Sequence, residues 1–108
     1  MAISKLSNKS QCVNHLDFYV GEDAEWIFRE KKNKYDLIRP LKSAIIAPEN
    51  WEIMEKMWHR CFFHYLRCEP EETVCCLTEP PMNPPENREQ IAEIMFETFG
   101  VKGLYIGV

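Results

Sequence analysis

Apolar residues recur at helical spacing through residues 51–66, which is the strongest pattern in the chain. This spacing places them on one wide stripe of a helix. The stripe consists of Trp51, Met54, Trp58, Cys61, Phe62, Tyr65 and Leu66. Pro70 cannot continue a helix, because its ring removes a backbone donor and clashes with the preceding turn. The pattern therefore predicts one long amphipathic helix that begins at Pro48 or Asn50 and ends before Pro70.

A second region, after Pro70, alternates between strand-like and helix-like patterns. Residues 73–78 form a continuous apolar run, which is typical of a parallel strand buried on both faces. A proline-rich loop then leads to residues 86–99, and residues 104–108 form a last apolar segment. The inward side of the helix predicted for residues 86–99 consists of Ile91, Ile94, Met95, Thr98 and Phe99. Strand, helix and strand in this order predict a βαβ unit with two parallel strands.

The ends of this second helix carry residues that suit helix caps. Asn83, or the neighbouring Glu86 and Asn87, can supply a side-chain cap at its start. Gly100 suits its end, because glycine readily adopts the left-handed conformation found there. We therefore expect a polar cap before the helix and a tight turn after it.

Weaker patterns occupy the first forty residues. Residues 1–14 are polar with little periodicity, which predicts a flexible N-terminal arm. Residues 15–20 alternate between polar and apolar, which predicts a short strand. A short helix is predicted to open at Glu22, with Trp26 and Ile27 on its buried side.

Composition narrows the class of protein. The 108 residues are 45% hydrophobic and 28% charged, which suits a single small folded domain and argues against disorder. The net charge of −4 disfavours nucleic acid or an anionic membrane as a partner, since both require a basic surface. No apolar run is long enough to cross a membrane, and the N-terminal segment lacks the apolar centre of a signal peptide. We therefore expect a cytoplasmic protein with no membrane insertion.

The cysteines and histidines offer the only candidate metal chemistry. An odd count of five cysteines without a secretory signal predicts free thiols. Cys61, His64 and Cys68 share a helix face, and with Cys75 or Cys76 they could in principle hold zinc. No CxxC pair supports such a site, and Cys61 lies on the apolar stripe. We therefore predict packing roles for these side chains, with no metal site and no catalytic residue.

Four segments of the chain carry a family resemblance. They read HLDFYVGEDA at residues 15–24, ENWEIMEKMWHRCFFHYLRCEPEE at 49–72, LTEPPMNPPENREQIAEIMFETF at 77–99 and GLYIGV at 103–108. Together they resemble the actin superfamily, and the match is most specific after residue 77. The resemblance implies an α/β fold over residues 15–108. It would be a partial actin-like subdomain of the ribonuclease H-like actin ATPase fold, with a βαβ unit and one long amphipathic helix.

The superfamily's nucleotide site has no counterpart in this sequence. Actin-type ATPases hold the phosphates between two glycine-rich loops with Asp-Asn-Gly or Asp-Cys-Gly and Asp-Ser-Gly-Asp-Gly patterns, whose amides and carboxylates bind phosphate and metal. The four glycines here lie outside any such motif: Gly21, Gly100, Gly103 and Gly107. We therefore expect no enzyme activity and no cofactor-binding residue in this chain. ATP and Mg²⁺ would be bound only if the rest of an actin fold were present.

The resemblance and the pattern together predict a partner-dependent structural protein. Two parallel strands need cover on both faces, so the chain looks like a piece of a larger sheet. We expect actin, or subunits of an actin-related complex that nucleates and branches filaments, as partners in the cytoskeleton. The residues predicted to meet a partner are Trp51, Trp58, Leu104, Ile106 and Val108. Two alternatives stay open: a fragment of an intact ATP-binding actin-fold protein, and an accessory subunit of an axonemal or other filament assembly.

Overall fold

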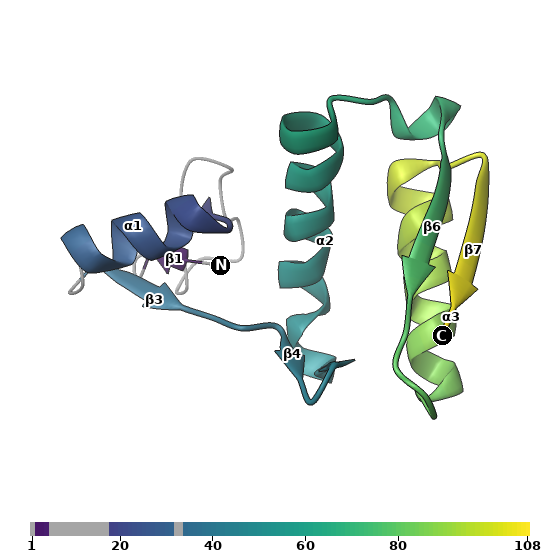
Figure 1. The fold of residues 1–108 in the computed structure, drawn as a ribbon, viewed down its shortest axis with the longest axis horizontal. Helices are drawn as coiled ribbons and strands as arrows, with labels where there is room; N and C mark the ends of the chain where they lie inside the picture. Colours follow the sequence, from purple (N-terminus) through teal and green to yellow (C-terminus); the bar gives the residue numbers. More distant parts are fainter. Residues whose placement is uncertain (1, 5–17, 32–33) are drawn as a thin grey trace. The chain divides into compact units, whose positions relative to one another are not determined.

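Two compact units make up the chain. The computed structural model describes residues 2–4, 18–31 and 34–108, and the contacts divide the chain into residues 1–40 and 41–108 (Figure 1). Sequence reasoning placed a single domain after the N-terminal arm, whereas the structure sets a boundary after Pro40. Each unit is therefore described by itself.

The first unit contains a three-stranded antiparallel sheet. Its middle strand is β1 (Ala2–Ser4), which pairs with β2 (Phe18–Tyr19) on one side and β3 (Tyr35–Leu37) on the other. The arm predicted for residues 1–14 therefore contains a strand at residues 2–4, and the rest of that prediction lies outside the described residues. The strand predicted at residues 15–20 is found at its last residues only, since 15–17 are also outside.

Helix α1 (Glu22–Glu30) packs against this sheet through two buried apolar residues. Ala24 and Ile27 are buried, and the half-buried Tyr19 and Tyr35 pack against them. The prediction that Trp26 lies on the buried side is wrong, because this side chain is 62% exposed. Ala24 and Ile27 are three residues apart and share a face, whereas Trp26 lies about 200° around the helix from Ala24.

The second unit opens with a tight hairpin that the sequence pattern did not reveal. Strand β4 (Leu41–Lys42) pairs with β5 (Ile45–Ile46) across a two-residue turn. Both turn residues have positive φ, 51° at Ser43 and 66° at Ala44. Such turns usually contain Asn-Gly or Asp-Gly, because other side chains are strained at positive φ. The usual sequence signal of a hairpin is therefore missing here.

The predicted long helix is present and has three consecutive parts. A 3₁₀ turn, η3 (Pro48–Asn50), leads into α2 (Trp51–Arg60), which continues as a π-helical segment, η4 (Cys61–Leu66). Met54 and Phe62 are its buried side chains within the core. The first half of the predicted apolar stripe therefore faces the core.

The second half of that stripe turns out to solvent. Tyr65 and Leu66 are exposed, contrary to the prediction. The π-helical segment has wider turns than an α-helix, so residues three and four positions after Phe62 do not return to its face. The segment ends at Arg67, which is left-handed with φ 53°, and the Cys68 N–H donates to the Phe62 carbonyl at 3.0 Å. This bond and the left-handed Arg67 close the helix end in a turn that is one residue wider than a Schellman turn.

The predicted βαβ unit is confirmed by a parallel strand pair. After a 3₁₀ turn, η5 (Pro70–Glu72), strand β6 (Val74–Thr78) pairs in parallel with β7 (Gly103–Gly107) over all five residues. The Glu79 N–H donates to the Gly107 carbonyl at 2.8 Å and extends the ladder beyond β6. Figure 1 shows the two strands running side by side.

The crossover between these strands is α3 (Pro85–Glu93) followed by the π-helical η6 (Ile94–Phe99). Gly100 ends it with φ 68°, as predicted. The predicted side-chain cap is wrong, because no side chain caps the start of α3, and Asn83 bonds a carboxylate instead. Thr98 is exposed rather than inward, since η6 shifts the helical phase.

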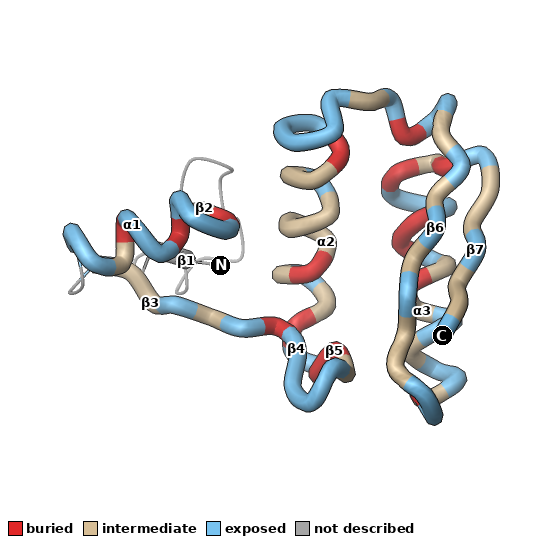
Figure 2. The backbone as a smooth tube through the Cα atoms, in the orientation of Figure 1, coloured by how far each residue is buried: buried red, intermediate tan, exposed pale blue. Residues whose placement is uncertain are grey.

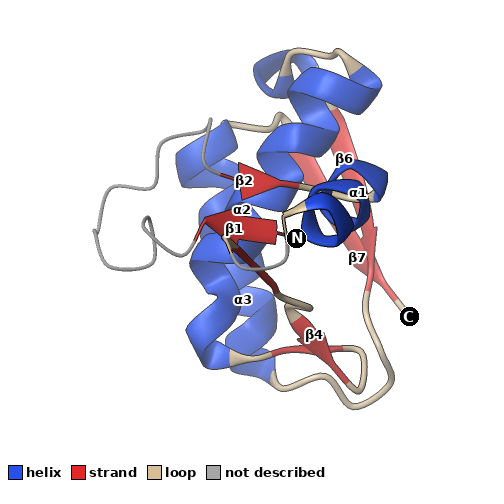
Figure 3. Ribbon diagram, turned by 90° about the vertical axis from the view of Figure 1, so that its left-hand side faces the viewer, coloured by secondary structure: helices blue, strands red, loops and turns tan. Residues whose placement is uncertain are grey.

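Helices α2 and α3 pack on the same face of the β6–β7 pair. The buried core of this unit consists of Ile46, Met54, Phe62, Ile91, Ile94, Met95, Phe99 and Val101. The strand residues that pack against it, Cys75, Leu77, Leu104 and Ile106, all belong to one face of the sheet. Figure 3 shows α2 and α3 on one side of the strands. No helix in the described part of the chain is long and apolar enough to span a membrane.

Candidate interaction surfaces

The other face of the β6–β7 pair is uncovered in this unit. Val74 is 70% exposed and Tyr105 is 65% exposed, and Cys76 is exposed beside Tyr105 in the register. Exposed and half-buried positions alternate along β6 (Figure 2), and in β7 Tyr105 is exposed between half-buried neighbours. The prediction that β6 is buried on both faces is therefore wrong, because the helices of this unit cover one face alone. We call Val74, Cys76 and Tyr105 the open face.

Glycines flank the aromatic residue of the open face. A Cβ atom on Gly107 would lie 2.8 Å from Cε1 of Tyr105, so the Tyr105 ring leans along the strand over Gly107. A Cβ atom on Gly103 would instead meet Val74 at 3.5 Å, an ordinary contact. The space that Gly107 leaves lets the Tyr105 ring lie low on the sheet. The open face therefore presents a broad aromatic surface rather than an upright side chain.

The five residues predicted to meet a partner do not form one surface. Trp51 and Trp58 are half-buried and pack against the core, and so do Leu104 and Ile106 from the covered face of β7. Val108 alone is largely free, at 85% exposure. The period of two along the strands places Tyr105 on the face opposite to Leu104 and Ile106, so the prediction did not include the open face. The predicted partner contact of these five residues stays a prediction, with Leu104 and Ile106 on the covered face.

Leu104 and Ile106 nevertheless reach a shallow groove beside α3. The groove has a volume of about 340 Å³. Its walls are apolar at Ala92, Phe96, Leu104 and Ile106, and Arg88 and Glu89 lie at its rim. Phe96 is exposed there. These two strand residues therefore contribute to the core and to an accessible apolar groove at once.

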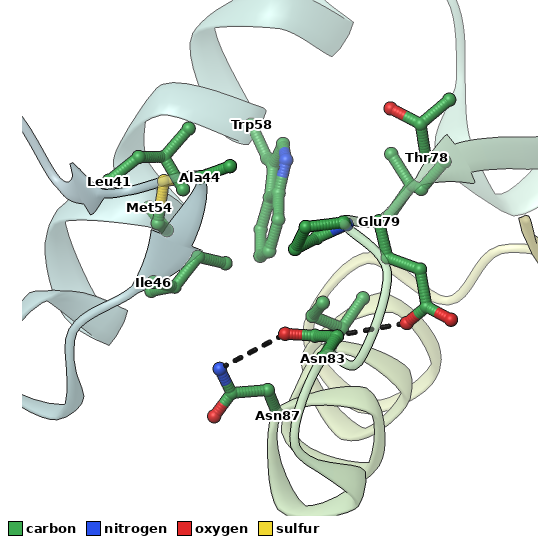
Figure 4. Close-up of a pocket in the computed structure, with 12 residues that line it drawn as sticks. Leu41, Ala44, Ile46, Met54, Trp58, Thr78, Glu79, Asn83 and Asn87 are labelled. Carbon is green, nitrogen blue, oxygen red and sulfur yellow. Dashed lines mark hydrogen bonds between the residues drawn. The ribbon is translucent and has the colours of Figure 1, made fainter. Parts of the chain in front are cut away.

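A larger cavity of about 490 Å³ lies between the hairpin, α2 and the start of α3 (Figure 4). Its apolar walls are Leu41, Ala44, Ile46, Met54, Trp58, Leu77, Pro80 and Ile91, and its polar edge is Thr78, Glu79, Asn83 and Asn87. Trp58 therefore faces a cavity inside the unit. The lining suits an apolar group with a hydrogen-bonding edge, and it contains no glycine-rich loop that could hold a phosphate.

Hydrogen bonds organise the polar edge of this cavity. The Glu79 side chain is only 5% exposed and accepts bonds from Arg88 Nε at 2.9 Å and Asn83 Nδ2 at 3.1 Å. Arg88 Nη2 lies 2.8 Å from the second carboxylate oxygen, which completes a bidentate pair. The Arg88 hydrogen bond lowers the pKa of Glu79 most; burial opposes it, and Asn83 adds to the lowering. An ionised, fully bonded Glu79 ties the loop after β6 to α3, which is a structural role.

Two thiols, those of Cys61 and Cys75, are poorly suited to nucleophilic catalysis. Burial is the main cause that raises the pKa of Cys75, and the neighbouring Cys76 and Cys68 raise it further. Burial also raises the pKa of Cys61. Since the thiolate is the reactive form, these shifts disfavour nucleophilic chemistry. Among residues 2–4, 18–31 and 34–108, no group of three or more His, Cys, Asp or Glu side chains is placed to hold a metal ion.

Comparisons with known proteins agree on one family. The actin family model matches residues 2–108. Actin-related protein 3 of Dictyostelium discoideum is 52% identical over 102 residues, covering 94% of this chain and 23% of that protein. The Schizosaccharomyces pombe and Saccharomyces cerevisiae proteins of the same name are each 50% identical, over 95% and 86% of this chain. The chain spans 23% and 20% of these two relatives.

Proposed function

The chain belongs to the actin family, and from this premise we propose that it is a non-catalytic structural protein that acts through contacts with other proteins. The observation that carries the proposal is the identity of about half of all aligned residues with actin-related protein 3 from several organisms. The assembly would be an actin-related complex of the cytoplasmic cytoskeleton that nucleates and branches filaments. Its partners would be actin or other subunits of that complex.

The absence of catalysis is proposed on the sequence. Binding of ATP by an actin fold depends on two glycine-rich loops whose amides and carboxylates hold phosphate and metal. The 108 residues contain neither loop, and their glycines lie at turns and on β7. This chain by itself would therefore bind no ATP and no Mg²⁺.

The contact surface is proposed to be the open face together with the neighbouring groove. Exposed apolar patches on folded proteins commonly mark interaction sites. Val74 and Tyr105 provide such a patch on one face of the sheet, and Leu104, Ile106 and Phe96 provide a second one at its edge. Val108 follows β7 directly and is 85% exposed. Trp51 and Trp58 are assigned to the core instead.

Co-sedimentation of the purified chain with actin filaments tests the contact proposal. We expect the natural chain to bind filaments and Tyr105→Ser to bind about tenfold more weakly, as for a moderate hot spot. Trp26→Ser is the matched control, since Trp26 is also an exposed aromatic residue but lies in the first unit. Binding that is absent, or equal for both variants, would contradict the proposed surface.

Calorimetric titration with ATP and Mg²⁺ tests the proposed lack of nucleotide binding. The expected result is no heat of binding at micromolar protein, because no loop in the chain can hold the phosphates. A dissociation constant in the micromolar range would overturn this part of the proposal.

A second candidate is that these residues act as part of a longer ATP-binding actin-fold protein. The coverage favours it, since the chain spans only 20–23% of the relatives' length. An antibody raised against residues 77–99 would distinguish the two candidates on an immunoblot of the native source. A band at a mass far above that of 108 residues would favour the longer protein. A band at the mass of 108 residues would favour the first candidate.

A further inference from the structure

The loop between β6 and α3 presents one strained and exposed side chain. Met82 has a positive φ of 61°, and at 97% it is the most exposed large apolar residue in the described part of the chain. The Asn83 N–H donates to the Pro80 carbonyl at 3.3 Å, so Met82 is the third residue of a tight turn. A positive φ at this position favours Gly or Asn, because a larger side chain is strained there.

The loop around Met82 is held firmly in place. Four prolines restrict its backbone, namely Pro80, Pro81, Pro84 and Pro85. The carboxylate of Glu79 is fixed by Arg88 and by the side chain of Asn83, the residue next to Met82. Because the loop is already ordered, a contact made by Met82 costs little further backbone entropy.

We propose that Met82 is an anchor that inserts into an apolar socket on a partner protein. Its backbone strain brings no packing within its own unit, so the side chain is placed for a contact outside the unit. Methionine suits such a contact, since its flexible thioether adapts to irregular apolar pockets. The partner surface that we propose is therefore an apolar socket.

The charged residues that follow the loop in α3 indicate which charges would border the socket on the partner. Glu86 and Glu89 are exposed in the first turns of α3, whereas the nearby cation Arg88 is paired with Glu79. An acidic surround fits a socket bordered by Lys or Arg. It also disfavours an anionic membrane as the partner, because the charges would repel. This inference rests on the proposed function, because its test uses purified actin filaments as the probe.

Co-sedimentation of the whole chain with actin filaments, paired with thermal melting, tests the anchor. Met82→Gly and Met82→Asn both remove the apolar side chain and suit a positive φ. The matched control is Ala44→Gly, because Ala44 also has a positive φ of 66° but lies in the hairpin. We expect the two glycine variants to raise the melting temperature. The two Met82 variants alone should weaken binding at least about tenfold, while Met82→Leu stays within about twofold of the natural chain.

The outcomes separate this inference from the proposed function. Equal binding by the natural chain, Met82→Gly and Met82→Asn overturns the anchor and leaves the proposed function standing. Weakening by Ala44→Gly as strong as that by Met82→Gly also overturns it, since backbone relief would then explain both. A natural chain that does not sediment with filaments overturns the inference and the proposed function together.

Discussion

The two faces of the β6–β7 pair come from alternate residues of the same strands, yet they are packed in opposite ways. Leu77 and Ile106 lie against the core on one face, whereas Val74 and Tyr105 are mostly exposed on the other. The residues on both faces are apolar, so composition does not explain the difference. Its cause is that α2 and α3 both pack on one side. The comparison teaches that an apolar strand residue in this fold marks either the core or an uncovered face.

The largest expected loss of stability comes from a substitution in the core beneath the covered face. Met95 is completely buried in the core of the second unit. Met95→Ala should lower the free energy of unfolding by about 3 kcal/mol, because it removes apolar contacts and leaves a cavity. Urea denaturation monitored by tryptophan fluorescence measures this change. A loss below about 1 kcal/mol would show that the covered face does not hold the unit together.

Two matched substitutions in β6 compare the faces directly. Leu77→Ala, on the covered face, should cost about 2 kcal/mol of unfolding free energy, since Leu77 is half-buried against the core. Val74→Ala, on the open face, should cost less than about 0.5 kcal/mol. Both can be measured by the same urea titration. Equal costs would mean that the open face is also packed in solution.

A smaller effect is expected from the Glu79–Arg88 pair, which anchors the loop on the covered side. The pKa of Glu79 is lowered mainly by the Arg88 hydrogen bond. Its contribution to stability is therefore present above the ordinary glutamate pKa of about 4.3, and it is lost as the pH falls through the lowered pKa. In Arg88→Leu, we expect a smaller loss of melting temperature between neutral and acid pH than in the natural chain.

The control for this pH series is Arg29→Leu in the first unit. Arg29 Nη2 lies 3.8 Å from Glu25 Oε2, and both side chains are well exposed. Their pairing should therefore contribute little to stability. The acid profile of this variant should match that of the natural chain. A match between Arg88→Leu and the natural chain would instead show that Glu79 does not titrate as its surroundings indicate.

Much of the second unit could be predicted from sequence because its patterns are periodic. The spacing from Trp51 to Phe62 indicated α2, and the order of apolar segments indicated the parallel pair. The hairpin was missed because Ser43 and Ala44 are unusual at positive φ. The outward turn of Tyr65 was missed because a π-helical segment changes the phase without a signal in the pattern.

The candidate surface was harder to predict than the fold. A continuous apolar run such as residues 73–78 looks the same whether one face or both faces of its strand are covered. Leu104 and Ile106 were therefore named as contact residues, while the open face was not. Which face is covered depends on where two helices pack, and this is a tertiary property that strand composition does not record.

Adjacent cysteines provide the most direct measurement of the two faces. Cys75 is half-buried on the covered face, and burial raises its pKa, whereas Cys76 is exposed on the open face. In two variants of the chain, each with Cys75 or Cys76 as its one cysteine and serine at the other positions, thiol labelling is timed at pH 8. We predict that Cys76 reacts at least about tenfold faster, since burial raises the pKa of Cys75 and restricts access to its thiol. Equal rates, or faster labelling of Cys75, would contradict the assignment of an open and a covered face.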